Sequence, residues 1–188
     1  IAVIMAGYDP DARANFDGMY EYYTAHPSVN DAGLMAWAQD QACNDVMGAD
    51  SATDGDLDIA YALWLAHRQW GSNGAVDYRA AATRIMASIL ASDVSASQSI
   101  LVGDWANGDA HATGTRPSDF MTHHLRVFAA ASGTARWNAI IDHTYTLVQY
   151  LQDHAAATTG LLPDFAIGAT GTTPLPAPGN WLEGPDDG

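Results

Sequence analysis

The sequence contains no lysine and almost no glutamate. All seven basic residues are arginine, and 20 of the 22 acidic residues are aspartate, so that Glu21 and Glu183 are the two glutamates. The formal net charge is −15 at pH 7. Binding to nucleic acid depends on cationic contacts to phosphates, so this charge argues against a nucleic-acid partner. A hydrated acidic surface that keeps the protein soluble, in ordinary medium or in high salt, fits the composition better.

Cysteine and long hydrophobic runs are also scarce. The single Cys43 excludes a disulfide within the chain. No apolar run approaches the roughly 20 residues that span a bilayer, so we expect no membrane partner. With 48% hydrophobic residues, the chain is expected to be globular. Residues 1–6 are apolar but lack the basic flank of a signal peptide, and we interpret them as the end of a helix that begins upstream.

Apolar residues recur at helical spacing along most of the chain. The patterns predict five helices, over residues 16–23, 59–70, 76–90, 118–133 and 137–151. The first is expected to stop at His26-Pro27 and the second at Gly71, while Ser118 is expected to cap the fourth. Short links between long amphipathic helices predict antiparallel helical hairpins and an all-α fold.

The remaining segments are long loops, over residues 29–51, 93–117 and 158–188. Long ordered loops on a helical scaffold commonly carry functional residues. The chain shows no strong β alternation and no linker that would divide it, so residues 1–188 are expected to belong to one domain.

The segment that starts the second helix carries three aspartates, Asp54, Asp56 and Asp58. One interpretation is structural: Thr53 caps the helix with Asp56 at the third position, and acids in the first turn favour the helix dipole. A functional interpretation starts from Asp54 and Asp58, which are four residues apart and share a face that continues into the apolar stripe. Turning these carboxylates toward the interior costs free energy of desolvation, which is expected only where they are paired or have a functional role.

The same segment carries a specific resemblance to glycoside hydrolase family 8. Its residues are similar to that family's signature: Ala52-Thr53-Asp54-Gly55-Asp56-x-x-Ile59-Ala60-x-Ala62-Leu63, followed by Ala66 and Trp70. Trp64 is bulkier than the aliphatic residue usual at its position. Three further segments resemble the family: Gly33-Leu34-Met35-Ala36-Trp37, Arg116-Pro117-Ser118-Asp119-Phe120 and Gly160-Leu161-Leu162-Pro163-Asp164-Phe165. The resemblance covers nearly the whole chain.

The resemblance implies a barrel of six inner and six outer helices, an (α/α)6 barrel, of which this chain supplies about half. The family's proton donor is a Glu in an S-E-G-x-x-Y-G motif, expected immediately before Ile1. Its Y-[DN]-A-x-R segment is expected after Gly188. We therefore expect residues 1–188 to be a partial catalytic domain, truncated at both ends, and inactive and poorly stable in isolation.

Two catalytic residues are implied. Asp54 matches the family's Asp that contacts the sugar at the cleavage point, where it would help to hold a distorted ring and the attacking water. Glu183, in Trp181-Leu182-Glu183-Gly184-Pro185, resembles the general base of the branch that includes chitosanases. In the other branch the base is an Asp inside Y-D-A-x-R. Alternatively, Glu183 is a solvated loop acid.

Three more residues are candidates for substrate binding. Trp37 and Trp105 lie on predicted loops and are suited to stacking on the apolar faces of pyranose rings. Trp70 and Trp137 fit helix stripes instead and are expected to be core. Asp119 is expected in the first turn of its helix, facing the cleft according to the resemblance, or else stabilising the helix terminus.

No cofactor and no metal site is expected. His123 and His124 are adjacent, so on a helix they face different directions, and we expect one packed and one exposed. Asp186-Asp187-Gly188 offers too few oxygen ligands for calcium.

The favoured function is therefore the inverting endo-hydrolysis of β-1,4 bonds in a glucan-type polysaccharide by a secreted enzyme that is a monomer when complete. Cellulose-type glucan is favoured as the substrate, with chitosan and mixed-linkage glucan close behind. The alternative is a helical domain that binds carbohydrate without catalysis.

Overall fold

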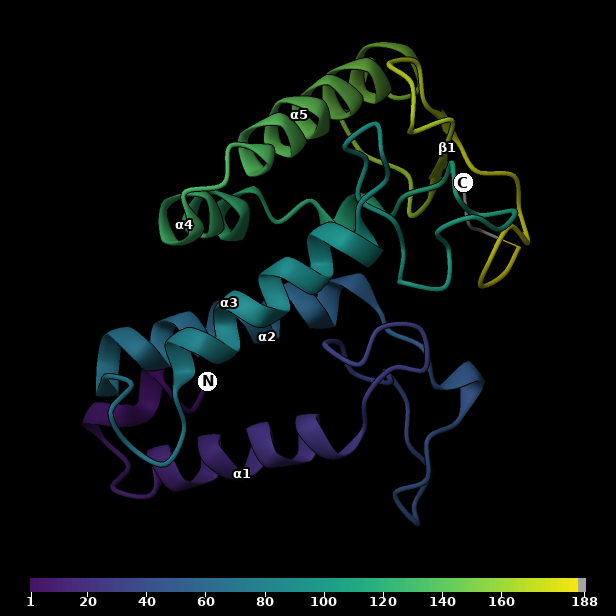
Figure 1. Cartoon of the computed structure of the whole chain (residues 1–188). Helices are drawn as coiled ribbons and strands as arrows, with labels where there is room; N and C mark the ends of the chain where they lie inside the picture. Colours follow the sequence, from purple (N-terminus) through teal and green to yellow (C-terminus); the bar gives the residue numbers. More distant parts are fainter. Residues whose placement is uncertain (186–188) are drawn as a thin grey trace. The chain divides into compact units, whose positions relative to one another are not determined.

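The computed structural model describes residues 1–185, and its contacts divide the chain into two compact units, with the boundary between Ile89 and Leu90. Helices dominate both units, which confirms the predicted all-α class (Figure 1). Within residues 1–185, none of the helices combines the length and the apolar character that crossing a membrane requires. The main elements are α1 (Ala12–Ala25), α2 (Thr53–Trp70), α3 (Tyr78–Ser88), α4 (Thr122–Ser132), α5 (Arg136–His154), β1 (Ala166–Ile167) and β2 (Leu175–Pro176).

Helix α1 packs within the first unit through aromatic rings. The ring of Phe16 lies 5.7 Å from the ring of Trp70, at the end of α2, and 5.7 Å from that of Tyr78, at the start of α3. The helix ends before His26-Pro27, as predicted, because the residue before a proline is disfavoured in helical conformation. One aromatic contact cluster therefore ties three helices of the first unit together.

Helices α2 and α3 form the predicted hairpin of the first unit (Figure 1). Gly71 ends α2 with a φ of +74°, a conformation that side chains disfavour. Asp77 caps α3, since its Oδ1 accepts a hydrogen bond from the backbone N–H of Ala80 at 2.9 Å. The apolar stripe of α2 is buried, with Leu57, Leu63 and other small or aliphatic residues at its centre.

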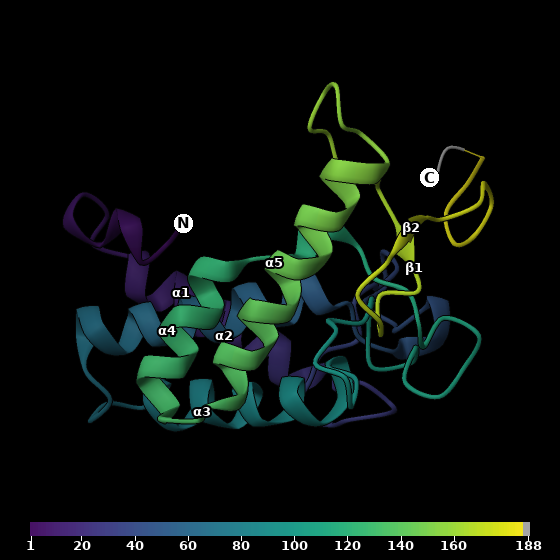
Figure 2. The same cartoon turned by 90° about the horizontal axis from the view of Figure 1, so that it is seen from above.

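Helices α4 and α5 form the corresponding hairpin of the second unit (Figure 2). Gly133 joins them in the left-handed region, with a φ of +68°. The fully buried Trp137 lies against Phe128, with ring centroids 5.2 Å apart. This placement confirms Trp137 as a core residue.

Two helix starts differ from the sequence prediction. The residue before α2 is Ala52, and the buried hydroxyl of Thr53 makes no hydrogen bond to the backbone as a cap would. Ser118 does not cap α4 either, because residues Pro117–Asp119 form a separate 3₁₀ turn. The non-helical backbone of Phe120 and Met121 separates that turn from α4. Both predictions were wrong because the same residue types occur at the cap of a helix and in the turn beside it, so that residue type alone does not identify the cap.

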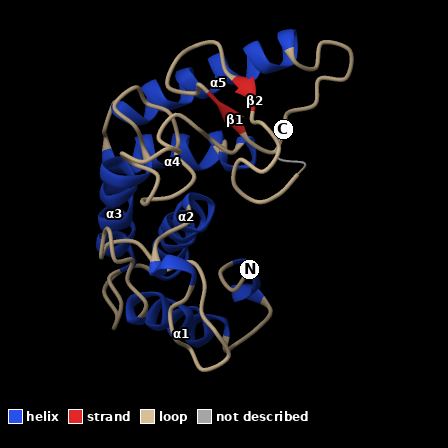
Figure 3. Ribbon diagram, turned by 90° about the vertical axis from the view of Figure 1, so that its right-hand side faces the viewer, coloured by secondary structure: helices blue, strands red, loops and turns tan. Residues whose placement is uncertain are grey.

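The long loops of the second unit have a small core of their own. The strands β1 and β2 pair antiparallel at its edge (Figure 3). Thr115 extends this pairing, since it exchanges two backbone hydrogen bonds of 2.9 Å with Ala166 of β1. The buried members of this loop core are Leu101, Val102, Ala106, Phe165 and Ala177, with Trp105, Ile167 and Trp181 packed against them. The loops are therefore ordered by burial as well as by hydrogen bonds.

Arg136, at the start of α5, fixes the segment that follows α3. Its guanidinium donates to the backbone oxygens of Leu90, Val94 and Ser95 at 2.5–3.3 Å, and to Oε1 of Gln98 at 2.8 Å. The first of these oxygens belongs to a π-helical turn over Ile89–Asp93, whose carbonyls need partners outside the helix. Arg136 therefore acts as the cap of this turn.

We expect Arg136→Ala to lower the free energy of unfolding by on the order of 3 kcal/mol, because several carbonyls lose a charged donor at once. The measurement is chemical denaturation of the complete protein carrying the variant. Arg126→Ala is the control, since Arg126 lies in the same unit and makes exposed hydrogen bonds to two hydroxyl oxygens, those of Tyr145 and Thr122, rather than to backbone carbonyls. Equal losses for the two variants would contradict the capping role.

Candidate functional site

Asp54 and Trp37, two of the predicted site residues, line the same cavity in the first unit. The cavity has a volume of about 220 Å³. Asp54 lies in the first turn of α2 and is exposed, and its Oδ1 accepts a hydrogen bond from the backbone N–H of Gly55 at 2.8 Å. The remaining lining residues are Met35, Ala52, Gly55, Asp56 and Ile59. A carboxylate and an indole therefore face one small space.

Trp37 is 49% exposed although Ala36, just before it, is fully buried. Leu34 and Ala36 anchor the segment in the core, and the backbone N–H of Trp37 donates to the carbonyl of Asp50 at 2.9 Å. The phenol of Tyr23 donates to the carbonyl of Gly33, at the start of the segment. The ring is thus held at the surface by a fixed backbone, which is what a stacking platform requires.

Of the three aspartates at the start of α2, Asp56 differs from Asp54 and Asp58 in its surroundings. Asp56 is buried, with 2% of its surface exposed, and Asp58 is exposed. Burial first, and then the charge of Asp56, raises the pKa of the Tyr23 phenol, which keeps that hydroxyl protonated as a donor. The prediction that Asp54 and Asp58 turn toward the interior is therefore wrong, because both are exposed, and the desolvation cost falls on Asp56 instead.

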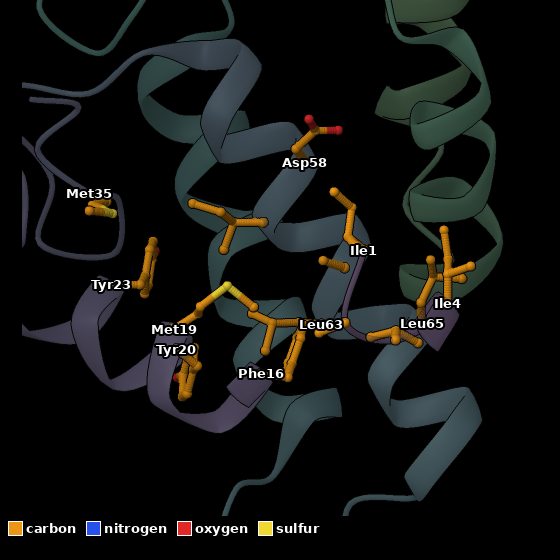
Figure 4. Close-up of a pocket in the computed structure, with 14 residues that line it drawn as sticks. Ile1, Ile4, Phe16, Met19, Tyr20, Tyr23, Met35, Asp58, Leu63 and Leu65 are labelled. Atoms are coloured by element: carbon orange, nitrogen blue, oxygen red, sulfur yellow. The ribbon is translucent and has the colours of Figure 1, made fainter. Parts of the chain in front are cut away.

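A second, larger cavity of the first unit is apolar. It has a volume of about 350 Å³, and Figure 4 shows its lining side chains. Phe16, Met19, Leu63 and Leu65 are among them, and the carboxylate of Asp58 stands at its edge. A sugar ring needs several hydrogen-bond partners for its hydroxyls. This cavity is therefore a poorer candidate for carbohydrate than the one beside Asp54.

Trp105 and Asp119 belong to the second unit. Trp105 is partly buried against the loop core, and its ring meets that of His111 edge-on, with centroids 5.1 Å apart. Asp119 is 2% exposed and accepts a hydrogen bond from the Ser118 hydroxyl at 3.0 Å. Its place in a 3₁₀ turn, ahead of α4, corrects the prediction that it lies in the first turn of that helix. Substrate binding by either residue stays a prediction.

Glu183 lies on an exposed turn of the second unit and pairs with an arginine. Its two carboxylate oxygens accept hydrogen bonds from Nη1 and Nη2 of Arg116 at 3.0 and 3.3 Å. The same guanidinium binds Asp164 through Nε at 3.1 Å and Nη2 at 3.3 Å. Arg116 belongs to the segment over residues 116–120 that resembles the family, but its link to Glu183, 67 residues away, carries no spacing signal.

The turn that carries Glu183 is held by a second contact that the sequence did not suggest. His111 lies edge-on to Trp181, with ring centroids 4.9 Å apart, and its Nε2 lies 3.3 Å from the carbonyl oxygen of Trp181. A Cβ on Gly114 would collide with the six-membered ring of Trp181. The bare backbone of Gly114 therefore provides the surface on which this indole rests.

The structure shows no metal centre among residues 1–185, since no three His, Cys, Asp or Glu side chains gather there as ligands would. His123 is exposed and His124 partly buried, as predicted. Asp186-Asp187-Gly188, considered for calcium, lies outside the described residues.

Comparison with known proteins identifies the family. The model of the family described as glycosyl hydrolases family 8 matches residues 2–175. A protein of Niallia circulans named beta-glucanase is 51% identical over 99% of this chain and 46% of its own length. A Bacillus sp. (strain KSM-330) endoglucanase is 40% identical over 97% of this chain and 39% of its own length. The chain thus spans less than half the length of these curated relatives.

The solved structure of a β-1,3-1,4-glucanase from Paenibacillus sp. X4 is also similar. It superposes with a TM-score of 0.96 at 49% identity, over the whole of this chain and 50% of the other. The fold is therefore part of the (α/α)6 barrel of that family. The family model covers most of the chain, and the chain belongs to family 8 of the glycosyl hydrolases.

Proposed function

We propose that this chain is part of the catalytic domain of an inverting endo-β-glucanase that hydrolyses β-1,4 bonds. The observation that carries the proposal is the 51% identity, over almost the whole chain, to a protein named beta-glucanase. The cavity that Asp54 shares with Trp37 supports it, because a carboxylate beside an indole platform suits a sugar bound at a cleavage point. The proposed substrate is a β-linked glucan, with mixed β-1,3-1,4 linkages included.

The proposed mechanism gives Asp54 and Glu183 different roles. Inversion needs one carboxyl to protonate the leaving oxygen and one carboxylate to activate water on the opposite face of the sugar, typically about 6.5–9.5 Å apart. We propose Glu183 as the base that takes the proton from water. Asp54 is proposed to hold the distorted ring and orient that water. We assign no residue of this chain to the proton donor.

The proposed localisation is outside the cell. An enzyme that cuts an insoluble or very long polymer must reach it where the polymer is, and such polymers do not cross membranes. The net charge of −15 is consistent with a secreted protein that stays soluble through its acidic surface.

Trp37→Ala is expected to raise KM for a soluble β-glucan roughly tenfold with a smaller change in kcat, because loss of a stacking contact worth about 1.5 kcal/mol falls mainly on binding. Trp37→Phe keeps a flat apolar ring and should retain most of the affinity. Initial rates over a range of glucan concentrations measure both constants. An unchanged KM for Trp37→Ala would remove this residue from the binding site.

The proposed function is tested with the complete protein that contains this chain. Cellulose-type glucan, mixed-linkage glucan and chitosan are incubated separately, and new reducing ends are counted. Proton NMR of the first products reads their anomeric configuration, and inversion of a β bond gives the α anomer. Release of α-anomeric oligosaccharides from a glucan is the expected result. Binding without release of reducing ends would favour the non-catalytic carbohydrate-binding domain, and release of β anomers would contradict inversion.

A further inference from the structure

Arg116 has an unusually well-fixed backbone for a surface arginine. Thr115, just before it, is bonded twice to Ala166 of β1, and Pro117, just after it, restricts the backbone on both sides of the peptide bond. Arg116 itself is extended, with φ −109° and ψ 113°. The side chain therefore starts from a defined position at the edge of the loop core.

The guanidinium of Arg116 lies over the ring of Phe165 and between two carboxylates. Its central carbon is 4.7 Å from the ring centroid of Phe165, and its nitrogens make four hydrogen bonds, two to Asp164 and two to Glu183. Burial by itself would lower the pKa of Arg116, but the hydrogen bond and charge of Asp164 and the charge of Glu183 raise it. Arg116 therefore stays cationic and holds a planar, bidentate geometry.

The turn that carries Glu183 is tight and anchored. The backbone N–H of Asn180 donates to the carbonyl of Gly184 at 2.6 Å, and the carbonyl of Trp181 lies beside Nε2 of His111. These contacts set the backbone of the turn. The direction of the Glu183 carboxylate is then set by its pair with Arg116.

Stability is a weak reason for this arrangement. The side chains of Arg116, Asp164 and Glu183 are 30%, 46% and 53% exposed, and ion pairs at such exposure contribute little to folding. A bidentate pair does, however, fix the plane and direction of a carboxylate.

We propose that Arg116 is a positioning residue for Glu183, which it orients so that the carboxylate can accept a proton from the attacking water. This inference rests on the proposed function, in which Glu183 is the general base. In that step the water oxygen bonds to the anomeric carbon and the water proton passes to Glu183. The bond to the leaving oxygen breaks, and that oxygen keeps the electron pair and takes a proton from the donor carboxyl of the complete protein. Asp164 holds the other side of the guanidinium and thereby keeps it in place.

The test uses the complete protein with a soluble β-glucan. Arg116→Gln should lower kcat by about 10–100-fold with little change in KM, because misplacing a catalytic group by about 1 Å can cost about 10²-fold. Arg116→Lys keeps the charge and loses the bidentate geometry, so its kcat should fall between those of Arg116→Gln and the parent. Arg126→Gln, a surface arginine of the same unit that pairs with Tyr145, should leave kcat unchanged.

Two further readouts separate positioning from a structural role. Azide attacks the anomeric carbon without a base, so it should restore cleavage in Arg116→Gln and yield a glycosyl azide of inverted configuration. In the Glu183→Gln background, Arg116→Gln should cause no further loss, because residues that act as a unit are not additive.

The outcomes distinguish the two proposals. If Glu183→Gln is slow while Arg116→Gln keeps kcat within twofold of the parent, Glu183 remains the base and the positioning role is wrong. Arg116→Gln that is slow, folded and unresponsive to azide also overturns the positioning role, as does full additivity in the double variant. Near-normal turnover of Glu183→Gln would show that Glu183 is not the base, and Arg116 would then have no base to position. If Arg116→Gln fails to fold, Arg116→Lys with azide decides the question.

Discussion

The Asp54→Asn variant of the complete protein is expected to lose about 10²–10³-fold in kcat on a soluble β-glucan. The amide keeps the size of the side chain but loses the charge that would hold the water and stabilise the positive charge developing on the sugar ring. Because this interaction strengthens in the transition state, KM should change much less than kcat. Initial-rate kinetics of the purified variant measure both constants.

Asp58→Asn is the matched control for this variant. Asp58 is also an exposed aspartate of α2, one turn further along the helix, and it lines the apolar cavity rather than the one beside Trp37. Its kcat should stay close to that of the parent. If Asp54 acts only through the helix dipole, Asp54→Asn will instead lower the melting temperature and keep its specific activity.

The Glu183→Gln variant is expected to lose about 10²–10⁴-fold in kcat, the usual contribution of general-base assistance. Glutamine keeps the length of the side chain and can still accept from Arg116 through its amide oxygen, but it cannot take a proton from water. Glu21→Gln provides the control, because Glu21 is the other glutamate of the chain and is exposed on α1. Azide should restore cleavage in Glu183→Gln and leave Glu21→Gln unaffected.

Near-normal turnover of Glu183→Gln would place the base in another segment of the complete protein. The chain would then not belong to the branch of the family that includes chitosanases. Membership of family 8 would be unaffected, since it rests on the match over residues 2–175.

The helices were predictable because their signals are local. The stripe from Ile59 to Trp70 lies within α2 and its stop, Gly71, follows directly, while the stripe from Trp137 to Leu151 lies within α5. Burial of one face follows directly from such spacing. Helix starts were less predictable. Thr53 and Ser118 are residue types that commonly cap helices, but whether a residue caps a helix depends on its backbone angles. Neighbouring residues such as Phe120 determine those angles.

The candidate site was predictable only in part. The Asp54 segment could be recognised from the sequence because its residues are contiguous and match a specific family signature. The contacts of Arg116 and His111 were not predictable because their partners lie 48–70 residues away in the chain, and only packing of the loop core brings them together. Trp105 illustrates the opposite case, since its loop position suggested an open platform whereas the loop core covers part of it.

The contact between Gly114 and Trp181 restricts which sequences can share this turn. Any side chain at position 114 would occupy the space of the indole, so a relative that places a tryptophan here must also keep glycine there. The two positions are 67 residues apart and should therefore change together during evolution. A joint occurrence of this glycine and this tryptophan would mark, within an alignment of complete sequences, the members whose turn has the same placement.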